Sequence, residues 1–362
     1  MPHARARRAP VFPHRAPPPH DMAKRMPPDF HGPPMTDTFA RRADALARRS
    51  YYEATVRRPA DDPALAEALD VDVCVIGAGF AGLSTALDCR ARGLSVAVLD
   101  ARRPGWGASG RNGGQLIAGF AKDGEIERQL GVEGARAAWA LSLDAIALVD
   151  ERIARHGIDC DLARGYLSVA THPRRVPELR QWMEGATARW GHPSLEWLDA
   201  RAVRARIASP RYVAGVHDPL SGHLHPLKYC LGLADAARRE GARLFSHTPA
   251  LEVVRGARPI VRTPAGEVRC RHVVACCNAG PGGVLPAATA ARIAPVASYI
   301  VATEPLGADR ANALIPGARR HATTTSFSTT SGCPPITGCC SAAARARRAR
   351  RPTRSSMRCA NG

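Results

Sequence analysis

The sequence predicts an α/β fold with a Rossmann-like domain and, from its length, a second domain. Three observations predict it: an apolar strand that runs straight into a glycine-rich turn, a helix and second apolar strand directly after that turn, and further strands that return after about residue 250. With 362 residues, of which 45% are hydrophobic, the chain is long enough for two packed domains.

The first unit covers residues 71–100. Residues 71–76 read VDVCVI and stop at a glycine, as a buried parallel strand does before a tight turn. Gly77, Gly79 and Gly82 have the G-x-G-x-x-G spacing, which allows the turn, the approach of a pyrophosphate and close packing of the next helix. That helix is predicted over residues 80–92, and its first N–H groups favour a phosphate. A second strand ends at Asp100, where a ribose-binding acid is expected, so the unit predicts a Rossmann-like dinucleotide site.

Two alternatives remain open for this unit. The glycines can simply shape an ordinary βαβ turn, without a ligand. If a dinucleotide binds, NADP fits poorly because Asp100 would repel a 2′-phosphate, although Arg102 and Arg103 next to it would attract one. NAD and FAD both remain compatible with these residues.

A second glycine cluster, GWGASGRNGGQ, occupies residues 105–115. So many glycines indicate close backbone approach, and the N–H groups of such a loop are good donors to an anion or a ring edge, although a flexible surface turn is the alternative. NAD enzymes need no second cluster here. VIGAGFAGLSTAL followed by GWGASGRNGGQ resembles the FAD-dependent D-amino-acid oxidase family, and the resemblance covers about residues 48–320.

The resemblance implies how the domains and the site are arranged. It implies a discontinuous, Rossmann-like FAD-binding domain over residues 66–158 and 209–285. Inserted into it would be a partial α+β substrate domain with a mixed sheet, over residues 159–208 and 286–320. His223 and His225 would lie near the flavin, with helix capping and packing as equal alternatives. The implied cofactor-binding residues are Gly77, Gly79, Phe80, Ala81, Gly82, Asp100, Ala101, Ser109, Gly110, Arg111, Asn112, Gly113, Gly114 and Gln115.

The resemblance also implies the chemistry. A hydride would pass to FAD from the carbon that bears the amine of an amine or amino-acid-like substrate, with polyamine-derived amines among the candidates and dioxygen or another compound as the electron acceptor. Because the cofactor carries the difficult step, no catalytic triad or metal is required, and no catalytic base can be named. His223 and His225 could form a metal pair, but the sequence shows no third ligand.

Composition limits the setting and the partners. Residues 1–34 are rich in Pro, Arg and His, without the apolar segment of a secretory signal, and we expect a disordered leader; Met35 is a plausible true start. No apolar run approaches the ~20 residues that span a bilayer. Eleven cysteines without a repeated spacing fit a reducing cytoplasm. Of the formal charge of +19, +4 falls in residues 1–34 and +7 in residues 321–362.

The last 42 residues differ from everything before them. Residues 321–362 are rich in Thr, Ser, Cys, Ala and Arg, contain no acid and show neither strand nor helix period, so the sequence predicts a disordered tail and a fold that is incomplete at the C-terminus. Codons can be chosen for residues 322–343 that, read one base out of phase, spell DDDFVLDYFRLSADHRLLFGGR, which resembles the family's continuation. We therefore expect a frameshift near His321; a natural basic tail is the alternative.

Two rival functions follow from the same observations. A pI near 10.4 could indicate a nucleic-acid-binding protein, but the charge lies in unpatterned ends without interleaved aromatic residues, so no specific nucleic-acid partner is expected. The other rival is an inactive product of a frameshifted gene.

Overall fold

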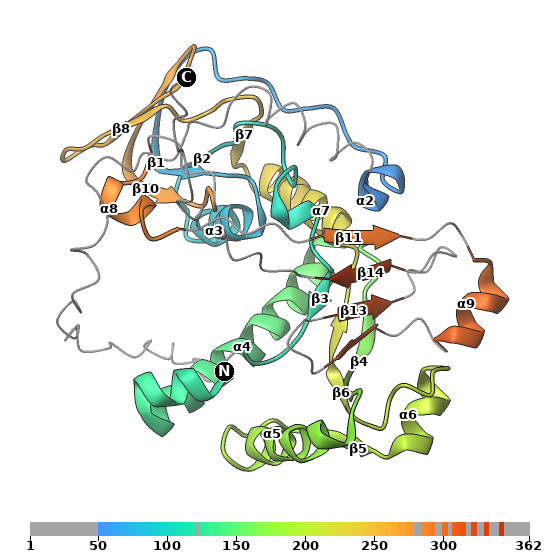
Figure 1. The fold of residues 1–362 in the computed structure, drawn as a ribbon. Coiled ribbons are helices and arrows are strands. Elements are labelled where there is room, and N and C mark those ends of the chain that lie inside the picture. The colour runs from blue at the N-terminus through green and yellow to red at the C-terminus, as the bar shows by residue number, and fades with distance from the viewer. Residues whose placement is uncertain are drawn as a thin grey trace, which may run out of the picture. The chain divides into compact units, whose positions relative to one another are not determined.

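The computed structural model describes residues 50–120, 123–278, 284–293, 299–302, 306–315, 320–323, 329–332 and 340–343. The predicted leader, residues 1–34, lies outside this part of the chain. Most of the described strands belong to two sheets, which are drawn with their helices in Figure 1.

The first sheet contains the glycine-rich unit and has the order β7-β2-β1-β10-β9-β8. Strands β7, β2, β1 and β10 are parallel, and β9 and β8 continue antiparallel. A glycine ends β1, as the sequence predicts, because Gly77 has φ +108°, which disfavours other residues. The strands are β1 (Ala68–Ile76), β2 (Val96–Leu99), β7 (Arg243–Phe245), β8 (Glu252–Val254), β9 (Ile260–Arg262) and β10 (Glu267–Ala275).

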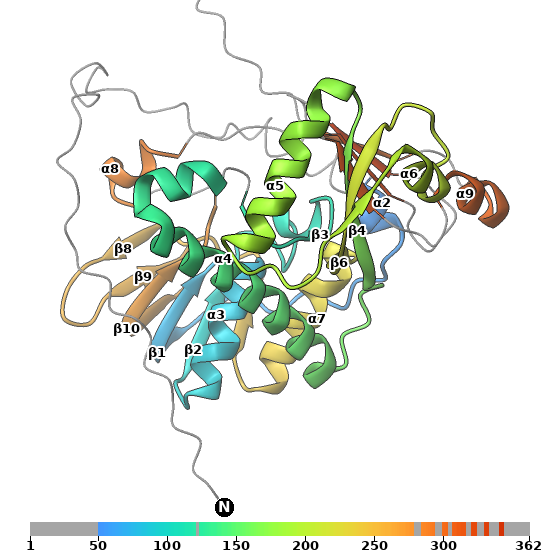
Figure 2. The same ribbon diagram turned by 90° about the horizontal axis from the view of Figure 1, so that it is seen from below.

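Helices α3 (Phe80–Ala91) and α7 (Pro226–Arg239) pack side by side on one face of this sheet (Figure 2). Val73 and Val75 of β1 meet Leu83 of α3 and Leu233 of α7 in one buried cluster. The long helix α4 (Asp123–His156), which has a non-helical residue at Gly131, adds side chains to the same cluster from its C-terminal half. Burial of these apolar side chains fixes α3 against β1 and so places the helix N-terminus at the glycine turn.

The second sheet has the order β11-β14-β13-β12-β4-β6-β3, with β5 paired to β6. Within it β12 runs parallel to β4, and the other pairs are antiparallel. Helices α5 (Val176–Ala188) and α6 (Ala200–Arg206) pack against β4 and β6. The strands are β3 (Gln115–Leu116), β4 (Ala163–Ala170), β5 (Glu196–Leu198), β6 (Ala214–His223), β11 (Tyr299–Ala302), β12 (Arg320–Thr323), β13 (Thr329–Gly332) and β14 (Cys340–Ala343).

The structure corrects two predictions at this level. The sequence assigns residues 209–285 to the cofactor domain, but β6 pairs with β4 and β5, so the second sheet extends to His223. The sequence of β6, AGVHDPLSGH, has no period-two apolar alternation and contains Pro219, so no strand signal marks this segment. Residues 321–362 were predicted to lack strands, yet β12, β13 and β14 lie there; the remaining residues of that stretch lie outside the described part.

Short elements complete the described chain. They are α2 (Tyr51–Ala54), η2 (Ala108–Gly110), η3 (Pro173–Arg175), α8 (Ala287–Ala290) and α9 (Ala308–Leu314). Among the described residues, no helix combines the length and the apolar character that crossing a membrane requires.

The contact between α3 and the glycine turn gives a first prediction. An alanine Cβ at Gly82 would lie 1.8 Å from the Gly77 carbonyl oxygen. Helix propensity favours alanine over glycine by only about 1 kcal/mol, whereas such overpacking costs more. We expect Gly82→Ala to lower the free energy of unfolding by about 2 kcal/mol or more in urea titrations.

Gly185→Ala is the matched control, because Gly185 lies inside α5 and nothing is within 4 Å of its added Cβ. It should raise the urea midpoint slightly. A rise with both substitutions would contradict the close packing of α3 on the turn.

Candidate functional site

The first glycine turn brings the start of α3 against the ends of β1 and β10. A Cβ at Gly77 would lie 2.5 Å from the Cys276 carbonyl oxygen, so this backbone approach requires glycine. Gly79 is the N-cap of α3 and makes no side-chain cap, and the first turn of the helix contains no acidic residue. The positive end of the helix is therefore available to an anion. Ala81, in the same turn, is exposed.

Asp100 joins this turn to the second strand. Its Oδ2 accepts a hydrogen bond of 2.8 Å from the Ala78 N–H, and its Oδ1 accepts one of 2.8 Å from the Arg102 N–H. Burial raises the pKa of Asp100, and these two hydrogen bonds offset only part of that rise. The carboxylate is therefore held at the tip of β2 as a strong acceptor, with the exposed Ala101 beside it.

The second glycine loop folds back onto the first. Ser109 Oγ accepts a hydrogen bond of 3.0 Å from the Phe80 N–H at the start of α3, and it would lie 2.7 Å from a Cβ at Gly79. A Cβ at Gly110 would lie 2.0 Å from the Gly105 carbonyl oxygen, so the loop is closed tightly on itself. The two glycine clusters, separated in sequence, thus form one continuous surface.

The other predicted loop residues divide into bracing residues and residues that face the second sheet. Asn112 Nδ2 donates to the Ala108 and Ser109 carbonyl groups, and its Oδ1 accepts from the Gly114 N–H at 2.7 Å. A Cβ at Gly114 would lie 2.1 Å from the Leu224 carbonyl oxygen. Asn112 and Gly114 therefore shape the loop.

Gln115 connects this loop to the second sheet. It pairs with His223 as part of β3, and its Nε2 donates a hydrogen bond of 3.0 Å to the Tyr166 hydroxyl of β4. Gly113, two residues earlier, is partly buried. Arg111 lies 4.4 Å from the centroid of the Trp106 ring, a cation–π contact that holds it along the loop.

His223 and His225 occupy different positions. His223 is buried at the end of β6, opposite Gln115 and Ala163. His225 is the N-cap of α7: its Nδ1 accepts from the Lys228 N–H at 3.2 Å, and its Nε2 lies 3.0 Å from Thr55 Oγ1. For His225 the capping alternative is the observed one. Among the described residues no group of three or more metal-ligating side chains is present.

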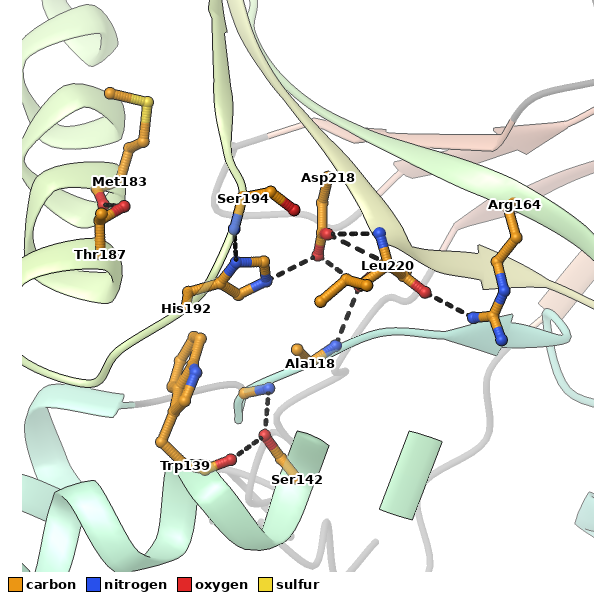
Figure 3. A network of polar contacts seen from close by, with 12 residues as sticks. Ala118, Trp139, Ser142, Arg164, Met183, Thr187, His192, Ser194, Asp218 and Leu220 are labelled. Carbon is orange, nitrogen blue, oxygen red and sulfur yellow. Dashed lines mark hydrogen bonds and ion pairs between the residues drawn. The ribbon is translucent and has the colours of Figure 1, made fainter. Parts of the chain in front are cut away.

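A buried polar network supports the approach to β3 (Figure 3). His192 Nε2 lies 3.2 Å from Asp218 Oδ2, and Ser221 Oγ donates to the same oxygen at 2.5 Å. Ser221 Oγ in turn accepts a hydrogen bond of 3.1 Å from the N–H of Ala118, which lies two residues after the end of β3. Burial alone would raise the pKa of Asp218, but the hydrogen bonds from His192 and Ser221 hold it below its usual range.

These features fit FAD. The start of α3 offers the positive end of the helix dipole and has no acidic residue in its first turn. Asp100 offers an acceptor to ribose hydroxyls, and the loop from Ser109 to Gln115 runs from the start of α3 to the edge of the second sheet. A dinucleotide whose second half extends along that loop would use both glycine clusters.

Comparison with known proteins shows which family the chain belongs to. The model of the family described as FAD dependent oxidoreductase (DAO) matches residues 72–351. The chain therefore belongs to this family of FAD-dependent oxidoreductases.

Among the curated relatives, gamma-glutamylputrescine oxidoreductase of Escherichia coli (strain K12) is 38% identical over 268 residues, which cover 74% of this chain and 63% of that protein. A probable oxidoreductase OrdL of Haemophilus influenzae is 38% identical over 273 residues, with the same two shares. The chain thus spans a little under two thirds of the length of these relatives.

Solved structures share the fold. Glycine oxidase from Bacillus cereus has a TM-score of 0.59 at 19% identity, over 78% of this chain and 74% of that chain. L-amino acid deaminase from Proteus myxofaciens has a TM-score of 0.59 at 17% identity, over 80% of this chain and 61% of that chain.

Sequence reasoning missed several residues that shape the site. Tyr166 lies 51 positions after Gln115, and Arg58, which donates to the Pro104 carbonyl oxygen, lies 46 positions before it. No local pattern marks either residue. The S-x-x-E pattern of Ser50 and Glu53 could have marked a helix start, and Ser50 indeed caps α2.

Asp100 gives the second prediction. Asp100→Asn replaces an acceptor with an amide, whose NH₂ group would oppose one of the two backbone N–H donors, and it removes the charge offered to the ribose. We expect FAD affinity to fall by about 1 to 3 kcal/mol, measured by the quenching of flavin fluorescence on titration.

Asp72→Asn is the control, since Asp72 also accepts from a backbone N–H and a hydroxyl, those of Ser95, and lies in the middle of β1, before the turn. An equal loss of affinity in both variants would remove Asp100 from the cofactor site.

Asp218 gives the third prediction, on pH. Because the folded pKa of Asp218 lies below its unfolded value, its stabilisation is present above about pH 4 and is lost as the pH falls through the folded value. We expect Asp218→Asn to cost about 1 to 3 kcal/mol at pH 7 and progressively less below about pH 4 in denaturant titrations.

Asp235→Asn, which removes an exposed ion pair with Arg239, should cost less than about 0.5 kcal/mol throughout. A gap between Asp218→Asn and the wild type that stays constant down to about pH 2 would exclude the ionised Asp218 as its source.

Proposed function

We propose that this chain is built to oxidise a primary amine of the gamma-glutamylputrescine type with FAD as the hydride acceptor. The observation that carries the proposal is the 38% identity to gamma-glutamylputrescine oxidoreductase over 74% of this chain. The family match, over residues 72–351, includes both glycine clusters. When bound, FAD would supply the acceptor for the hydride on the carbon that bears the neutral amine, and hydrolysis of the imine product would give an aldehyde and ammonia.

The residues of the chain have distinct parts in this proposal. The start of α3 would bind the pyrophosphate, Asp100 would accept from the adenosine ribose, and Ser109 to Gln115 would line the flavin side. Gln115 and Tyr166 would lie where the second glycine loop meets the second sheet. Their hydrogen bond would orient the surface that contacts the substrate amine. Dioxygen or another acceptor would reoxidise the flavin.

We also propose that the chain as written is impaired. Residues 321–362 contain no acidic residue, and a one-base shift of suitable codons there encodes a family-like continuation. In the second sheet these residues supply β13, β14 and all but the first residue of β12. Of these strands, β12 pairs with β4. A change of reading frame would therefore alter the substrate side of the molecule and its stability, which for a domain is only ~5 to 15 kcal/mol.

The experiment that tests both proposals compares the present chain with one whose alternative frame is restored after residue 321. Each is purified, its cofactor is released by heat and identified by absorbance, and ammonia release is measured with gamma-glutamylputrescine, putrescine and glycine. We expect FAD in both, weakly held in the present chain, and turnover of gamma-glutamylputrescine mainly in the restored chain.

The outcomes separate the proposals. Folded protein without flavin contradicts the cofactor site, and FAD-loaded protein that oxidises only glycine contradicts the substrate class. Equal turnover by both chains, or source DNA whose shifted frame does not encode an FVLDYFRL-like stretch, contradicts the frameshift.

A further inference from the structure

Residues 50–65, which we call the strap, precede the part of the chain matched by the family model and pack beside α7 (Figure 1). Tyr52 is 3% exposed and its ring lies 5.0 Å from that of His225, and Leu65 is 2% exposed. Asp62 receives two hydrogen bonds from Arg238, of 2.6 and 2.9 Å, at the other end of α7. The strap is therefore anchored at both ends of this helix.

The middle of the strap is hydrogen-bonded to the start of the second glycine loop. Arg58 donates two hydrogen bonds to Glu53, Nε to Oε2 at 2.8 Å and Nη2 to Oε1 at 2.6 Å, and its Nη1 donates to the Pro104 carbonyl oxygen at 2.8 Å. The two side chains are only 10% and 12% exposed. Such a two-pronged, buried pair has one well-defined geometry, so the third donor of Arg58 is fixed in direction.

The peptide group that accepts from Arg58 makes a second hydrogen bond on its opposite edge. The carbonyl of Pro104 and the N–H of Gly105 belong to one peptide plane, and that N–H donates to the Ala78 carbonyl oxygen at 3.1 Å. Since a peptide is planar, two anchors on opposite edges fix its orientation. Gly105 in turn sets the position of Gly110, whose added Cβ would lie 2.0 Å from the Gly105 carbonyl oxygen.

Charge links the strap to the same loop. Burial alone would raise the pKa of Glu53, but the hydrogen bonds and charge of Arg58, together with the charges of Arg103 and Arg111, hold it below its usual range. Arg103 Nη2 lies 3.8 Å from Glu53 Oε2. Glu53 is thus a shared counter-ion of Arg58 and of Arg103, which lies just before the second glycine loop.

We propose that Arg58 is a positioning residue for FAD binding: held by Glu53, it fixes the Pro104–Gly105 peptide and so presets the second glycine loop for the cofactor. The proposal rests on the assignment of FAD to the two glycine clusters. It gives the strap a part in cofactor affinity, in addition to its contribution to folding.

The test measures FAD affinity by fluorescence titration and, separately, amide hydrogen exchange of the cofactor-free protein over residues 105–111. Arg58→Met keeps much of the side-chain length but none of the donors. We expect it to weaken FAD binding about tenfold or more, the usual scale for a lost charge-assisted hydrogen bond, and to speed exchange in the loop. Arg58→Lys keeps the charge with a single donor group and should restore part of both.

Asp62→Asn is the matched control, because it breaks an equally two-pronged pair in the same strap that does not touch the loop. It should lower the melting temperature as Arg58→Met does, yet leave the FAD dissociation constant within about twofold of the wild type. Equal weakening by both variants would make the strap a purely structural element and overturn the proposal.

Two further outcomes also overturn it, and they differ in what they imply for the cofactor site. If the wild type binds FAD and Arg58→Met binds it equally well with unchanged loop exchange, only the role of Arg58 is wrong. If the folded wild type binds no FAD, the cofactor site itself is wrong, and the role of Arg58 is wrong with it.

Discussion

Hydrogen bonds made to the first glycine turn are the constraint on which the site depends. Asp100 accepts from the Ala78 N–H in the first turn, and Ser109 accepts from the Phe80 N–H at the start of α3. Each bond joins a residue of the second strand or second loop to the first turn, so neither cluster can move alone. The packing of α3 and α7 on the sheet then holds this joined surface against the core.

This arrangement has a cost when no cofactor is bound. The pKa of Asp100 is raised by burial, so the folded state favours its protonated form, and stability falls as the pH rises through the range between the unfolded and folded values. Above that range the desolvated carboxylate of Asp100 therefore lowers the stability of the folded state. Ribose hydroxyl groups that donate to it would favour the charged form, which makes cofactor binding and the stability of this turn one coupled equilibrium.

How much the sequence could predict depended on whether the signal was local. The turn at Gly77, Gly79 and Gly82 and the strand ending at Asp100 follow from spacing and apolar pattern, and the structure has them where expected. The position of β6 could not be predicted, because its sequence lacks the apolar alternation of a half-buried strand and contains a proline. The hydrogen bond from Arg58 to Pro104 was equally hidden, since it depends on how far-separated segments meet in the fold.

The hydrogen bonds that shape the two glycine clusters and the strands from Arg320 onward lie in different parts of the described chain. Every hydrogen bond that joins the two glycine clusters to each other and to the strap comes from residues before His321. The second sheet is different. In it β4 lies between β12 and β6, and β6 pairs with β3, which begins at Gln115, the last residue of the second glycine loop. In the described part of the chain, β12 connects to the second glycine loop through β4 and β6, so changes in β12 should alter the second sheet more than the two glycine clusters.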